Sequence, residues 1–121
     1  MTTRMMLIAV LSCLSMSASA HDAIGPHGGW LTDAGPYHIE LVVHSGNVHL
    51  YVSDTDDKPI SAAGFKALAI LAAAGKPQRI VLQSIENARL SGPAPGDLAT
   101  PPKGVVQLTA PDGKTAQAKF Q

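Results

Sequence analysis

The sequence predicts an all-β protein, an immunoglobulin-like antiparallel β-sandwich of seven or eight strands. From Gly28 onward, short apolar segments are separated by clusters of Gly, Pro, Asp and Asn, which are typical of the turns between strands. In the clearest segments apolar and polar residues alternate, and this period of two indicates strands with one buried face. A domain of about 100 residues is large enough to form one such core.

The first three strands are expected to form a meander. They cover roughly 29–32, 37–44 and 48–53, with turns over 33–36 and 45–47. Five aliphatic residues of the second and third strands should be buried on one face: Ile39, Leu41, Val43, Leu50 and Val52. The opposite face of the same strands is polar and carries most of the histidines.

Further strands are expected at 65–72, 79–84, 88–91, 105–110 and 115–120. The Ala-rich segment 61–75 is ambiguous, because its alanines favour a helix that would end near Gly75 and Pro77. We predict a strand near Phe65 to Ala72, since the segment is apolar on every side and a helix would need a single apolar stripe.

Residues 1–20 resemble a cleavable export signal. Arg4 precedes a short apolar run, and Ala18-Ser19-Ala20 is the small-x-small pattern that signal peptidase accepts. The run is too short to cross a bilayer, so no membrane span is expected. A lipoprotein site at Cys13 is the less well formed alternative. We therefore expect a periplasmic protein whose single domain, 21–121, begins at His21.

The composition of residues 21–121 excludes several function classes. Eight Lys and Arg residues face nine Asp and Glu residues, and this balance favours neither nucleic acid nor an anionic membrane as a partner. The only cysteine and all four methionines lie in the signal segment, which argues against disulfides and a Cu(I) site. No G-x-S-x-G, P-loop or H-E-x-x-H motif occurs, so we expect no enzyme. A copper brace at the N-terminal histidine, as in copper-dependent oxygenases, is the one oxidative alternative.

All five histidines lie between positions 21 and 49. A free N-terminal His21 can chelate a metal with its α-amine and Nδ1. A two-residue turn at Gly46-Asn47 would set His44 opposite His49, whereas a turn at Ser45-Gly46 would place them on a diagonal. The expected ligands of a Cu(II), Zn(II) or Ni(II) ion are His21, His27, Glu40, His44 and His49. Taken singly, each histidine is an ordinary occupant of a polar sheet face.

Several short motifs resemble a known family. They are His27-Gly28-Gly29, Tyr37-x-x-Glu40-Leu41-Val42, Leu50-Tyr51-Val52-x-Asp54 and Lys58-Pro59-Ile60. The pattern is similar to that of small exported bacterial proteins and of a module in periplasmic adaptor subunits of heavy-metal efflux systems of the RND type. The resemblance implies a periplasmic β-sandwich linked to metal resistance, with His27 and Glu40 as candidate functional residues.

The predicted function is therefore non-catalytic binding of Cu(II) or another divalent ion in the periplasm, as a buffer or carrier linked to heavy-metal efflux or resistance. The competing hypothesis is a metal-free interaction module that docks on a partner protein. Convergent imidazoles would favour the first hypothesis, and a bare apolar edge or patch would favour the second.

Overall fold

The computed structural model describes residues 24–121. The expected cleavage after Ala20, the lipidation alternative at Cys13 and the His21 chelate lie outside these residues. No helix that is long and apolar enough to cross a bilayer occurs in the described part of the chain.

Eight antiparallel strands make up the fold, so the predicted class and strand number are confirmed. They are β1 (Trp30–Ala34), β2 (Tyr37–His44), β3 (Asn47–Ser53), β4 (Lys66–Ala73), β5 (Lys76–Ile85), β6 (Arg89–Pro93), β7 (Gly104–Thr109) and β8 (Thr115–Phe120). The Ala-rich segment forms β4, as predicted. Its alternate residues are buried, and its small side chains let neighbouring strands pack closely on both sides.

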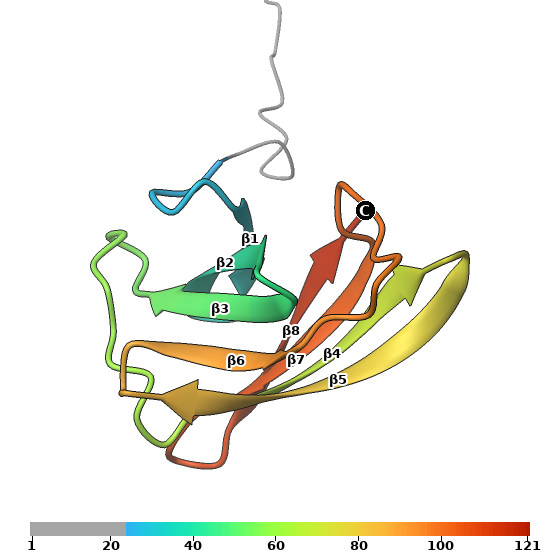
Figure 1. The fold of residues 1–121 in the computed structure, drawn as a ribbon. Coiled ribbons are helices and arrows are strands. Elements are labelled where there is room, and N and C mark those ends of the chain that lie inside the picture. The colour runs from blue at the N-terminus through green and yellow to red at the C-terminus, as the bar shows by residue number, and fades with distance from the viewer. Residues whose placement is uncertain (1–23) are drawn as a thin grey trace, which may run out of the picture.

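All eight strands belong to one hydrogen-bonded sheet in the order β1-β2-β3-β6-β5-β4-β7-β8, in place of the two sheets of an immunoglobulin fold. The hairpins β4-β5-β6, followed by β7 beside β4, form a Greek key. The sheet curls until its two edge strands, β1 and β8, meet (Figure 1). At this seam the Thr32 hydroxyl donates a hydrogen bond of 3.1 Å to the Lys119 carbonyl oxygen. The result is a sandwich-like, nearly closed barrel.

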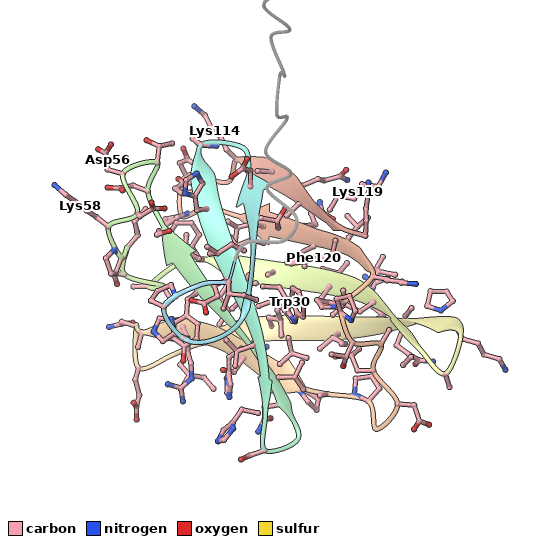
Figure 2. All side chains as sticks on the ribbon, turned by 90° about the horizontal axis from the view of Figure 1, so that it is seen from above. Trp30, Asp56, Lys58, Lys114, Lys119 and Phe120 are labelled. Carbon is pink, nitrogen blue, oxygen red and sulfur yellow. The ribbon has the colours of Figure 1, made fainter. Side chains whose placement is uncertain are left out.

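The core lies inside the curled sheet. Nine large aliphatic side chains are fully buried there: Ile39, Leu41, Leu50, Leu71, Leu82, Leu90, Leu108, Val48 and Val106. Trp30 and Phe120 come from the two edge strands and line the seam between them (Figure 2). The polar side of β2 and β3 therefore faces outward, as the alternation predicted.

The β2–β3 hairpin adopts the second of the two turns that the sequence allowed, and the expected burial of Val43 is wrong. Its turn is Ser45-Gly46, both with positive φ (51° and 76°), so Val42 pairs with His49 and His44 pairs with Asn47. This is the two-residue turn whose twist matches the flanking strands, and it puts His44 and His49 on a diagonal instead of opposite each other. Val43 is 51% exposed because it lies at the hairpin tip, beyond the core. The first strand also begins and ends later than predicted, at Trp30 and Ala34.

Candidate functional site

The outer face of β2 contains a buried carboxylate. Glu40 is 3% exposed and accepts three hydrogen bonds. The backbone N–H groups of His27 and Gly29 donate to Oε2 at 2.9 and 2.8 Å, and His27 Nδ1 lies 2.7 Å from Oε1. Because a carboxylate only accepts, His27 Nδ1 carries the proton and donates it. Both carboxylate oxygens are thus hydrogen-bonded to groups of the same chain.

A tight turn over Gly25 to Gly29 supplies these donors. Gly28 N–H donates to the Gly25 carbonyl oxygen at 3.0 Å, and Gly25 N–H donates to that of Gly29 at 2.9 Å. Gly28 has a φ of +76°, which favours glycine, and a Cβ at Gly25 would overlap the Glu40 carboxyl group. The H-G-G motif and Glu40 therefore form one unit, the Glu40 clamp, in which the turn wraps a carboxylate.

The His27 ring lies flat on Tyr51. Their ring centroids are 3.6 Å apart and the planes differ by 6°. Tyr51 pairs with Glu40 across β2 and β3, so the ring and the carboxylate fix His27 from two sides. Glu40, an expected metal ligand, hydrogen-bonds to the His27 ring and orients it. This leaves His27 Nε2 as the ring nitrogen without a partner among residues 24–121.

Beside the clamp is a shallow hollow of about 390 Å³, here called the imidazole hollow. Three of its six lining residues are histidines, namely His27, His44 and His49. The other three are Val42, Tyr51 and Arg89. His49 Nδ1 forms a 2.5 Å hydrogen bond with the hydroxyl of Ser91 on β6. The fold therefore brings three of the expected ligands to one hollow and fixes the Nδ1 of two of them.

The environment of His49 favours a neutral ring. Burial, the Arg89 guanidinium and His44 together lower the pKa of His49 below its ordinary value of 6.5, with burial the largest cause. Neutral imidazole is the form that binds metal, so this shift reduces competition from protons. Arg89 also places a positive charge at the hollow, which opposes a bound cation.

His38 lies elsewhere on the same face and has a different environment. Its Nδ1 is 2.8 Å from Asp57 and its Nε2 is 3.2 Å from Asp33. The Nδ1 contact is a hydrogen bond, and both ring nitrogens face carboxylates. His38 lies outside the imidazole hollow.

On the other side of the His27–Tyr51 stack is a larger cavity of about 570 Å³, the apolar groove. It lies between the Gly25–Gly29 turn and the loop over residues 54–61. Leu31, Pro59, Ile60 and Ala88 supply much of its apolar lining. No feature of the sequence alone indicated this groove.

Of the expected site residues within 24–121, His27, His44 and His49 line one hollow, whereas Glu40 bonds to His27 and does not line it. His27 and Glu40 are bonded to each other, while His44 and His49 lie diagonally across the hairpin. Within residues 24–121 no three His, Cys, Asp or Glu side chains form a ready metal centre. The sequence reading missed Tyr51, Arg89 and Ser91 as neighbours of the site. Strand alternation places Tyr51 on the His49 face, but nothing local shows that β6 lies beside β3.

Comparisons of the chain with protein-family models, with curated proteins and with solved structures found no match. The resemblance to heavy-metal efflux adaptors thus stays a prediction from the motifs.

Proposed function

We propose that this protein is a non-catalytic, periplasmic binding protein for a divalent metal ion, Cu(II) in the first instance, and that it acts as a buffer or carrier for heavy-metal efflux. The observation that carries the proposal is that His27, His44 and His49 line one hollow. Imidazole is a favoured ligand of Cu(II), Zn(II) and Ni(II), and the described residues offer no sulfur ligand on this face.

The rings are held as metal-binding histidines usually are. Such histidines commonly donate one ring nitrogen to a carboxylate or another fixed group, and this bond orients the other nitrogen toward the metal. Glu40 provides this support for His27, and Ser91 provides it for His49. The support lowers the cost of ordering two of the three rings.

The ion itself must complete the site. Because no three ligands are already gathered in residues 24–121, binding requires His44, which is exposed at the hairpin tip, to turn toward His49. In this proposal the His44–His49 diagonal pair and His27 are the ligands from the sheet, and the α-amine and imidazole of His21 are the further donors.

Calorimetric titration of the purified protein with Cu(II), Zn(II) and Ni(II) tests the proposal. We expect at least one ion, Cu(II) first, to bind with a Kd below about 1 μM. Affinity should fall as the pH drops through about 6.5, where ordinary histidines gain a proton. Changing both His44 and His49 to Ala should weaken binding strongly, and capping the N-terminal amine should weaken it further.

His38→Ala is the matched control, because both nitrogens of this ring already face carboxylates. It should leave Cu(II) affinity unchanged. A native protein that binds none of the three ions tighter than about 1 μM would end the metal proposal. So would unchanged affinity after both the double substitution and the capping.

A second candidate is a metal-free module that docks on a partner protein. It is favoured by the outer face of β4 and β5, where Ile70 and Val81 are 43% and 56% exposed and Leu68 pairs with Val81. Exposed apolar patches often mark docking surfaces. If the metal titrations fail, this face becomes the leading candidate, and Val81→Glu is then the variant that should abolish docking.

A further inference from the structure

The apolar groove adjoins the proposed metal site, because His27 lines both. Its volume of about 570 Å³ falls within the range of about 300–1,000 Å³ that is typical of small-molecule sites. It shares only His27 and Tyr51 with the imidazole hollow, and His44 and His49 do not line it.

Apolar groups of the groove are accessible from solvent. Leu31 and Ile60 are half-buried, whereas Pro26, Pro59 and Ala88 are exposed. They come from three separate segments: the Gly25–Gly29 turn with β1, the loop over 54–61, and the turn before β6. A ligand with an apolar body would remove this surface from water, which is the main driving force for binding in such sites.

Apart from His27, the side chains of the groove lining that carry a permanent charge are acidic. The lining contains the carboxylates of Glu40 and Asp57 and no Lys or Arg. Glu40 is enclosed by its three hydrogen bonds, so Asp57, 77% exposed, is the accessible charge. Only its Oδ1 contacts His38. Lys58 follows Asp57 but does not line the groove, and its side chain projects outward from the loop, as does that of Asp56 (Figure 2).

We propose that the apolar groove binds a small amphipathic cation, with its apolar body between Leu31, Ile60 and Ala88 and its ammonium group beside Asp57. The sign of the charge determines the ligand class, because an amphipathic anion would meet a carboxylate and find no cationic side chain in the lining. This site shares His27 with the proposed metal site but does not involve His44 or His49.

The test compares two probes of equal chain length, decylamine and decanoate, below their micelle-forming concentrations, by isothermal titration calorimetry on the purified protein. We expect decylamine to bind at least about tenfold more tightly than decanoate. Asp57→Asn should reduce this preference to below about threefold. Asn is a conservative choice there, because Asp57 has a φ of +61° and Asn tolerates this conformation.

A second variant tests the location. Ala88→Trp should fill the groove and abolish decylamine binding, whereas Ala63→Trp, at an exposed alanine outside the lining, should not. Equal binding of the two probes, no binding of decylamine, or an unchanged preference in Asp57→Asn would each overturn the proposal. Loss of decylamine binding in the His44 and His49 double variant would also overturn it, since those residues lie outside the groove.

Discussion

The two ends of the outer face of β2 use histidine in opposite ways. At the Glu40 end, His27 is fixed by a buried carboxylate and by stacking on Tyr51. At the hairpin end, His44 is exposed, and no hydrogen bond to its ring is present among residues 24–121. His49 lies between these extremes, half-buried and bonded to Ser91.

The difference shows that the partner of a histidine on this face decides whether the ring is fixed or exposed. The buried carboxylate makes the His27 end a structural unit, because two backbone amides depend on it as well. His44 at the hairpin tip has no such role, because its ring is exposed and makes no hydrogen bond within residues 24–121. We therefore expect substitution of Glu40 to affect mainly stability, and substitution of His44 and His49 to affect mainly metal binding.

The largest expected effect is that of Glu40→Ala. This change leaves the N–H groups of His27 and Gly29 and the His27 ring without their acceptor, and we expect a loss of about 3 to 5 kcal/mol in the free energy of unfolding. Urea denaturation followed by circular dichroism measures it. Glu86→Ala, at an exposed turn position, should change stability by less than about 0.5 kcal/mol. Equal effects of the two variants would show that the clamp is not structural.

A second prediction compares two inward positions of β2, Leu41 beside Glu40 and Val43 at the hairpin end. Leu41 is fully buried, so Leu41→Ala should cost about 2 to 5 kcal/mol by leaving a cavity. Val43, one inward position further along β2, is 51% exposed, and Val43→Ala should cost less than about 1 kcal/mol. Chemical denaturation of both variants checks this. A larger loss for Val43→Ala would mean that the hairpin tip is packed against the core.

Strand alternation predicted most of the fold but only part of the site. It located β2 and β8 to the residue and put Glu40, His44 and His49 on one face, since these features depend on local sequence. The hairpin register needed the backbone conformation of Ser45, which local sequence left open. The pairing of β3 with β6 involves residues about 40 positions apart, and the burial of Glu40 depends on a turn before β1. Such long-range packing leaves no periodic signal in the sequence.

A smaller loss of stability is expected when the hydrogen bond between His49 and Ser91 is removed. Ser91→Ala leaves a half-buried imidazole without its partner and should cost about 1 kcal/mol. Gln83→Ala is the control, because Gln83 pairs with Ser91 from β5 but is exposed. Ser91→Ala should also weaken Cu(II) binding, since loss of this hydrogen bond frees the His49 ring to rotate. Weaker Cu(II) binding without any loss of stability would show that the bond positions the ring and does not hold the strands.

The smallest expected effect on stability, and the finest test of the site, is that of Arg89→Gln. Removing the guanidinium should raise the pKa of His49, but the value should stay below 6.5 because burial, the largest cause, remains. A lowered pKa means that the unfolded chain binds the proton more tightly than the folded one, so stability falls as the pH drops below about 6.5. In Arg89→Gln this loss of stability at low pH should be smaller. NMR titration of the His49 ring measures the change in its pKa directly. Cu(II) should bind more tightly, by up to about tenfold, since a repelling charge is gone. Unchanged or weaker Cu(II) binding would show that repulsion by Arg89 does not limit the affinity of the imidazole hollow.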